Sequence, residues 1–350
     1  MVENKLQSGY INCMNKPYIF TYDGELLQLV PKDEESIKPY DSFKNKNINY
    51  EVLEGDTIGF DKIFFLNCRL QVSLSGYIAK PAGYVCFSNG ERKFDVITFK
   101  GGIIDYFYRP NHIIDESNTQ YDYNTGEATL KLKTFDETSK QIEVEVAGKK
   151  AILTLSVTLP GEPLHMQIDY NLGKPKSIFR LTFHEPVDVS EFRTIYMWIY
   201  NLMVFLNFRK DISMGKIELG KTNEEKRIEH IGYIYLNEKE KNDISNIDRI
   251  IGYYFVFEHI NELLQIVNKE DLNLLFIPRC EKEDKYISAE KYMICCTSFE
   301  SVFNYVFPNA KIENSEKASE VKNEFLQYIE LKREEYKGKD SKKTKKLKKY

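Results

Sequence analysis

The stretch QIEVEVAGKKAILTLSVTL, residues 141–159, decides the fold of the N-terminal half. Apolar and polar residues alternate over 142–146 and again over 151–159, which predicts two strands, each with one buried and one solvated face. Between them, residues 147–150 read Ala-Gly-Lys-Lys and supply a tight connection. We therefore interpret the stretch as a β-hairpin.

Strand patterns continue on both sides of this hairpin. Alternation recurs at 130–133 and 179–183, and apolar runs predict earlier strands at 17–21, 25–30, 61–75, 82–88 and 93–108. Strand and helix patterns do not alternate regularly along the sequence, which disfavours a doubly wound parallel fold. Many half-buried strands with charged outer faces favour an antiparallel β-sandwich or barrel.

The pattern changes to helical spacing after Asp188. Asp188 and Glu191 have the spacing of a capping box, and the apolar residues that follow cover nearly all sides of a helix over 192–206. Such a helix is expected to be buried against the sheet. Two more strands are predicted at 214–219 and 227–236.

The polar segment 237–249 is interpreted as a linker, after which the chain becomes helical. Apolar stripes predict helices over 257–267, 292–306 and 316–336. The predicted fold class is therefore mixed α+β. It has a β-rich domain at 1–240 with a buried helix and a helical region at 250–350.

Charge is unevenly distributed along the 350 residues. The whole chain has a net charge of −4, whereas residues 337–350 contain eight lysines and one acid and therefore carry +7. Residues 1–336 then carry −11, which argues against RNA binding by the β-rich part. Candidate RNA contacts at the basic end are Lys342, Lys343, Lys345 and Lys346, and a solubilising end is the simpler alternative.

Motifs for catalysis or metal binding are missing from the sequence. The six cysteines form no C-x-x-C pair, the five histidines no H-E-x-x-H, and no glycine-rich phosphate loop is present. We therefore assign no catalytic residue, no metal ligand and no cofactor. Residues 1–10 lack a secretory pattern and the apolar stretch 195–208 is short for a membrane span, so a cytoplasmic protein without membrane contact is expected.

The loop over 109–127 is the candidate ligand loop of the β-rich part. Tyr121 and Tyr123 lie there among Asp and Asn residues, and exposed tyrosines stack on sugars or bases. An ordinary surface loop in a tyrosine-rich chain is the alternative.

The layout resembles that of ApeA-type proteins, in which an ApeA N-terminal domain precedes a HEPN domain. The resemblance rests on the β-rich beginning, on the apolar helix containing IYMWIYNL at 195–202, and on SFESVF at 298–303. Phe299, Glu300 and Phe303 are similar to the aromatic-Glu-apolar pattern that opens the HEPN portion.

This resemblance implies a ribonuclease module of bacterial anti-phage abortive-infection defence behind a sensing domain. HEPN catalysis uses an Arg-x(4–6)-His motif, usually paired across a dimer. Three arginines here precede a histidine by shorter distances, in the pairs Arg109/His112, Arg180/His184 and Arg227/His230. The resemblance thus implies either that the motif lies beyond residue 350 or that the chain is a degenerate member of the family.

The resemblance therefore predicts the sensing portion of an ApeA-like ribonuclease. RNA, a phage-derived protein trigger and a second copy of the chain are its expected partners. The alternative is a non-enzymatic β-sandwich module that recognises a protein or a carbohydrate.

Overall fold

A computed structural model describes most of the chain. The described residues are 6–32, 48–59, 61–87, 92–122, 124–129, 131–159, 174–236, 250–269, 276–280, 283, 288–306, 323–324, 326–328, 330–331 and 334. Contacts divide the chain into two compact units, unit 1 (Met1–Ile294) and unit 2 (Cys295–Tyr350). All strands that the structure describes lie in unit 1, before residue 237.

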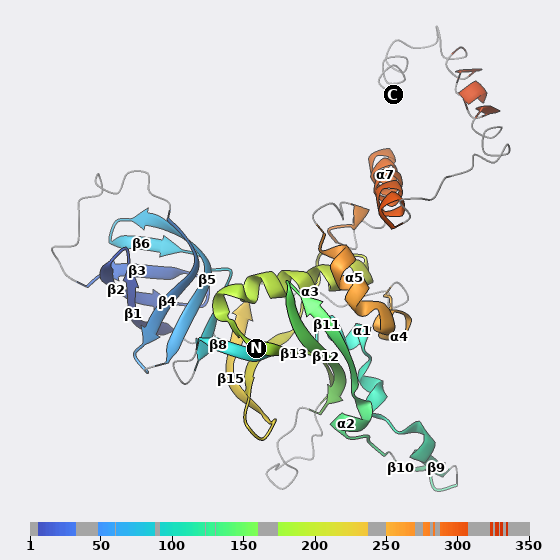
Figure 1. Ribbon diagram of the computed structural model, residues 1–350, viewed down its shortest axis with the longest axis horizontal. Coiled ribbons are helices and arrows are strands. Elements are labelled where there is room, and N and C mark those ends of the chain that lie inside the picture. The colour runs from blue at the N-terminus through green and yellow to red at the C-terminus, as the bar shows by residue number, and fades with distance from the viewer. Residues whose placement is uncertain are drawn as a thin grey trace. The chain divides into compact units, whose positions relative to one another are not determined.

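The first six strands of unit 1 close into an antiparallel barrel (Figure 1). Around the ring they run β1–β2–β3–β6–β5–β4, and β4 pairs with β1 again. Their bounds are β1 (Gln7–Cys13), β2 (Lys16–Tyr22), β3 (Leu27–Pro31), β4 (Ile48–Thr57), β5 (Lys62–Ser73) and β6 (Gly76–Ala79). Closure removes the free edges that an open sheet would expose.

Aromatic side chains fill this barrel. Phe20, Tyr22 and Phe65 are buried, and the Phe65 ring meets the other two edge-on at centroid distances of 5.4 and 5.2 Å. Alternation in β1, β2 and β3 points every second side chain inward, so their burial has a period of two residues. The predicted antiparallel barrel-like architecture is thus confirmed.

Seven further strands continue the sheet from β5. Their order is β7–β15–β14–β8–β13–β12–β11, and all neighbours are antiparallel. We call these seven strands the large sheet. Their bounds are β7 (Gly83–Phe87), β8 (Lys93–Lys100), β11 (Lys140–Val146), β12 (Lys149–Thr158), β13 (Lys176–Asp188), β14 (Lys216–Thr222) and β15 (Ile228–Leu236).

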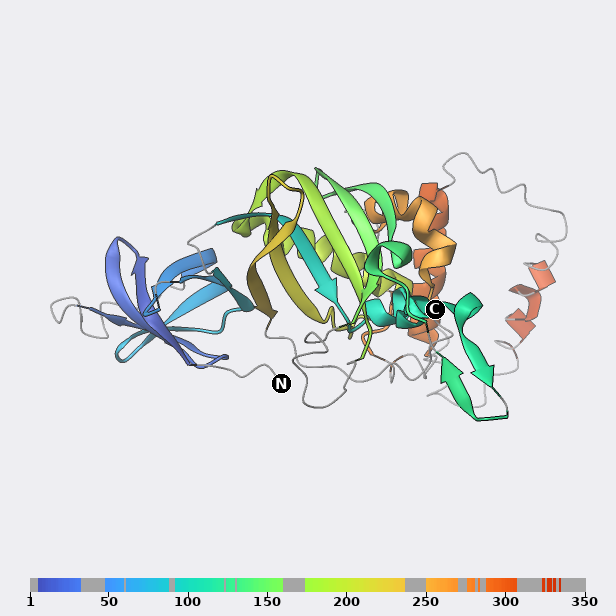
Figure 2. The same cartoon turned by 90° about the horizontal axis from the view of Figure 1, so that it is seen from below.

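The predicted 141–159 hairpin is present as β11 and β12, and its turn is Ala147 and Gly148 alone, since Lys149 already pairs with Val146. The smaller strands β9 (Gln120–Asp122) and β10 (Glu127–Thr129) form a separate hairpin, which extends away from the large sheet (Figure 2).

Helix α3 (Phe192–Asn207) packs on one face of the large sheet, as its apolar surface predicts. Ile195, Ile199 and Leu202 are fully buried there with Phe179 and Leu181 of β13. The predicted capping box is wrong in detail. Asp188 instead accepts from the Ser190 amide and caps the short helix η6 (Val189–Glu191), while α3 itself has no side-chain cap.

The strand predicted over 93–108 ends early, because two glycines turn the chain. Gly101 and Gly102 have φ values of +70° and +58°, which favour glycine, and β8 stops at Lys100. The remainder forms helix α1 (Ile104–Phe107). Short helices follow as η3 (Pro110–Ile113), η4 (Glu116–Asn118) and α2 (Phe135–Thr138).

Several helices follow residue 250, and one of them covers the edge strand β11 of the large sheet. They are α4 (Tyr253–Val256), η8 (Phe257–His259), α5 (Ile260–Val267) and α7 (Ala289–Val306). Two side chains of α5 form hydrogen bonds with backbone groups of the edge strand β11. Asn261 accepts from the Glu145 amide at 2.8 Å, and Gln265 donates to the Glu145 carbonyl at 2.6 Å. The helix predicted at 316–336 lies largely outside the described residues. None of the helices in the described part is long and apolar enough to cross a membrane.

Candidate functional site

The large sheet has two chemically different faces. Phe179, Leu181 and Phe183 of β13 point into the core beneath α3. Because side chains alternate along a strand, Arg180 and His184 point to the opposite side, which we call the second face. This face contains charged residues in the middle of strands, where the first face contains only apolar ones.

Four charged residues gather on the second face, and we call them the cationic cluster: Lys100, Arg180, Lys216 and Glu218. They lie on β8, β13 and β14, which are adjacent strands. The register places Thr98 of β8 between Arg180 on one side and Glu218 on the other. Three cations thus surround one carboxylate, leaving an excess of two positive charges.

Glu218 is the anionic centre of the cluster. Its carboxylate lies 2.5 Å from Nζ of Lys100 and 3.3 Å from Nζ of Lys216. The Glu218 side chain is 17% exposed, that of Lys100 25% and that of Lys216 52%, so solvent reaches all three. Burial by itself would raise the pKa of Glu218, but the two lysines outweigh it and hold this pKa below its ordinary value.

The positive charge of Arg180 is less well compensated than those of Lys100 and Lys216. Its Nε donates to Oγ1 of Thr98 at 3.3 Å, and its guanidinium lies 5.1 Å from the centre of the Phe135 ring of α2. Burial lowers the pKa of this guanidinium, and the charge of Glu218 partly opposes the shift. Among the residues that the structure describes, no carboxylate forms an ion pair with Arg180. A partly buried cation without an anion partner is costly, and a bound anion would offset the cost.

Aromatic side chains border the cluster on β15. Tyr233 is the cross-strand neighbour of Glu218, and Nζ of Lys216 lies 4.0 Å from the centre of its ring. The imidazole of His230 lies 4.0 Å from the same ring, centre to centre. Desolvation lowers the pKa of His230, so this imidazole is neutral near pH 7 and adds no charge to the cluster.

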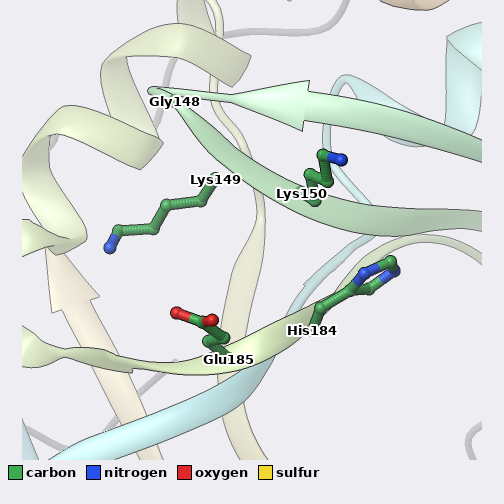
Figure 3. Close-up of a pocket in the computed structure, with 5 residues that line it drawn as sticks. All are labelled: Gly148, Lys149, Lys150, His184 and Glu185. Carbon is green, nitrogen blue, oxygen red and sulfur yellow. The ribbon is translucent and has the colours of Figure 1, made fainter.

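A separate pocket of about 310 Å³ lies between the β11–β12 turn and β13 (Figure 3). Figure 3 shows Lys149 and Glu185 on one side of it and Lys150 and His184 on the other. Lys149 is paired with Glu191 at 2.8 Å, outside the pocket lining.

Each lysine of this pocket has an acidic neighbour. Lys150 has Glu145 as its cross-strand neighbour, and Lys149 is paired with Glu191. The charges in and around the pocket therefore nearly cancel, and the cationic cluster is the stronger candidate for binding an anion.

The candidate ligand loop is only partly described. Tyr121 lies on β9 with 54% of its surface exposed, while Tyr123 lies outside the described residues. The Asp122 carboxylate accepts from the amides of Asn124 and Thr125, so the segment is a turn closed by its own side chain. Tyr121 belongs to the separate β9–β10 hairpin, whereas the cationic cluster lies on β8, β13 and β14.

The family-pattern residues all lie on α7, in unit 2. Phe299 is 71% exposed, Glu300 is exposed and Phe303 is half-buried. The rings of Phe299 and Phe303 stack with their centres 6.2 Å apart, as expected one helical turn from each other. The candidate RNA contacts Lys342, Lys343, Lys345 and Lys346 lie outside the described residues.

The four histidines that the structure describes are dispersed through unit 1. His112 lies in η3 against Tyr108, His184 and His230 lie on β13 and β15, and His259 ends η8. Within the described residues, no group of three or more His, Cys, Asp or Glu side chains is arranged to hold a metal ion.

Sequence reasoning missed the cationic cluster. Its signal was the placement of charged residues at the second-face positions of otherwise apolar strands, namely Lys100, Arg180 and Glu218. Alternation places each of them on a face, but only the pairing of β8 with both β13 and β14 brings them together. Comparison with protein-family models, with curated proteins and with solved structures found no match to this chain.

Proposed function

We propose that this chain is a recognition module, the sensing portion of an ApeA-like HEPN ribonuclease in bacterial anti-phage defence. The carrying observation is the cationic cluster, in which Arg180 is partly buried and has no carboxylate partner among the described residues. A sheet that needed only stability would gain more from apolar residues at these positions. The unmatched charge is explained if the second face binds an anionic ligand.

The helical part of the proposal rests on α7. Phe299 and Phe303 form an aromatic pair on this helix, with Phe299 mostly exposed. Large exposed aromatic side chains mark surfaces that other elements cover. We propose that further helices of a HEPN bundle, including those of a second copy, cover this pair, and that RNA contacts the basic end at 337–350.

Binding of anions by the full chain tests the sensing role. Arg180→Ala should weaken binding of its anionic ligand by at least about tenfold, because the cluster loses the cation that forms no ion pair within the described residues. The matched control is Arg227→Ala, since Arg227 lies in the turn between β14 and β15, is exposed and is paired with Glu225. A panel of phosphate, sulfate and carboxylate ligands, screened by thermal unfolding and titration, is the measurement. Equal loss in both variants would contradict the sensing role of the cluster.

The oligomeric state tests the proposed role of α7. Phe299→Ser should raise the dimer dissociation constant by at least about tenfold in light scattering, because an exposed aromatic anchor is removed from the interface. Tyr254→Ser removes an equally exposed aromatic residue of α4 and should leave the constant unchanged. A monomeric wild-type chain at all concentrations would reject the dimer.

A second candidate function is recognition of a phage-derived protein or a carbohydrate by the β9–β10 hairpin. It is favoured by the exposure of Tyr121 on a hairpin that extends from the large sheet (Figure 2). Tyr121→Ala should then abolish binding in a glycan array or in a titration with phage structural proteins. Tyr10→Ala, which removes a similarly exposed tyrosine of the barrel, is the control. Unchanged binding in Tyr121→Ala would exclude this hairpin.

A further inference from the structure

We infer that the cationic cluster is a binding site for a phosphate monoester, and specifically for a nucleoside monophosphate. The inference deepens the proposed function and rests on it, since it names the ligand that the second face would recognise. It is drawn from four observations: the net charge of the cluster, the terminal N–H groups of Arg180, the position of Lys100 relative to Arg180, and the neighbouring Tyr233.

The net charge of the cluster favours a phosphate ligand over a carboxylate ligand. Lys100, Arg180 and Lys216 surround Glu218, so the cluster has two positive charges in excess. A phosphate monoester carries about −1.5 to −2 near pH 7 and neutralises that excess, whereas a single carboxylate leaves one charge unmatched. The partial burial of Arg180 and Glu218 makes unmatched charge costly here.

The donors of Arg180 are arranged for an oxyanion. Only its Nε has a hydrogen-bond acceptor among the described residues, Oγ1 of Thr98. Within the described part of the chain no acceptor meets the terminal nitrogens of the guanidinium, and their planar fork matches two oxygens of a phosphate. The Phe135 ring 5.1 Å away holds the guanidinium from one side and so limits its orientations.

Lys100 lies close enough to Arg180 to contact the same phosphate. It is two residues beyond Thr98 on β8, and Thr98 pairs directly with Arg180, so Lys100 is the diagonal neighbour of Arg180. Diagonal neighbours of antiparallel strands lie about 7–8 Å apart, a span that two long side chains close around one phosphate. An ammonium has three donors, so Lys100 can hold Glu218 and a phosphate oxygen together.

The organic part of the ligand has an aromatic neighbour. Tyr233 stands beside Glu218 across the β14–β15 pair, is half-buried, and has both Nζ of Lys216 and the centre of the His230 ring 4.0 Å from the centre of its own ring. Bases stack on such rings without strong sequence preference. A nucleoside monophosphate thus places its phosphate at Arg180 and Lys100 and its base toward Tyr233, which a simple phosphate cannot do.

Titration calorimetry on the full chain in low salt tests this, with AMP, adenosine, inorganic phosphate and citrate as probes. AMP should bind, inorganic phosphate more weakly and adenosine not at all, with affinity falling as salt rises. Arg180→Ala should weaken AMP binding at least about tenfold and Arg227→Ala less than about twofold. Arg180→Lys keeps the charge but loses the fork, so an intermediate affinity is expected, and circular dichroism verifies that each variant folds.

The outcomes separate the two proposals. Citrate binding at the cluster without phosphate or AMP binding would overturn the phosphate assignment and leave the sensing function standing. AMP binding that Arg180→Ala and Arg180→Lys leave unchanged would place the nucleotide elsewhere and overturn this site. Adenosine binding as tightly as AMP would overturn the role of phosphate. No binding of any anion would overturn both proposals.

Discussion

The ammonium of Lys100 lies 2.5 Å from the Glu218 carboxylate, on the neighbouring strands β8 and β14. The two residues are more than a hundred positions apart in sequence, and only the β8–β14 pairing brings them together. The contact fixes the lysine beside Arg180 and keeps the carboxylate ionised. It therefore links the stability of the large sheet to the electrostatics of the cationic cluster.

Glu218→Gln should destabilise the chain in a pH-dependent way. The pKa of Glu218 lies below its ordinary value of 4.5 in the folded state. Its stabilisation is therefore complete above that value and is lost as pH falls through the folded pKa. We expect a loss of about 1 kcal/mol near pH 7 that shrinks as the pH falls below 4.5 and through the folded pKa, measured by urea unfolding. Glu127→Gln, at an exposed position of β10, is the control, and a pH-independent difference would contradict the ion-pair explanation.

Gly215→Ala should be far more harmful than Gly148→Ala. Both glycines have positive φ, +73° and +77°, so alanine costs about 1–2 kcal/mol at either from the backbone alone. A Cβ on Gly215 would also collide with the Lys100 carbonyl oxygen and lie 2.9 Å from that of Gly101, whereas one on Gly148 meets nothing within 4 Å. Thermal unfolding compares the two variants. Since Gly215 precedes Lys216, its replacement should also weaken anion binding, which Gly148→Ala should not.

Leu153→Ala should remove a large part of the stability of unit 1. Leu153 lies on the core face of β12 and is fully buried in the core that α3 covers. Truncating a buried leucine costs about 2–5 kcal/mol, through lost burial and the cavity left behind. Leu74→Ala, at a position 92% exposed, should change the unfolding free energy by less than about 0.5 kcal/mol. Equal effects in urea titrations would contradict the packing of β12 against the core.

Cysteine reactivity should follow burial. Cys68 is buried in the barrel, and burial together with the charge of Cys13 raises the pKa of its thiol to about 12. It should remain unmodified by iodoacetamide near pH 8, because the thiolate is the reactive form. Cys296 is exposed on α7 and should be alkylated first. Mass spectrometry of the peptides measures the order, and in urea all six cysteines should react equally. Rapid labelling of Cys68 in the native chain would contradict a closed barrel.

Local patterns predicted the elements whose environment is set by nearby residues. The 141–159 hairpin follows from strict alternation around a tight turn, and α3 from apolar residues on nearly every side. The strand expected over 93–108 was wrong after Lys100, because the positive φ of Gly101 and Gly102 turns the chain and apolar residues alone do not reveal such a turn. Asp188 was assigned to the wrong helix start, since it caps η6 one turn earlier.

The sequence by itself determined that this chain has an antiparallel β-rich part, a buried helix and later helices, because periodicity records which face of each element avoids water. It also determined the faces on which Arg180 and Glu218 lie. Only the tertiary structure decided that β4 returns to β1 and closes a barrel, and that β8 joins β13 to β14. Pairing between distant strands depends on the packing of the whole sheet, which no local pattern encodes. The cationic cluster exists only through that pairing.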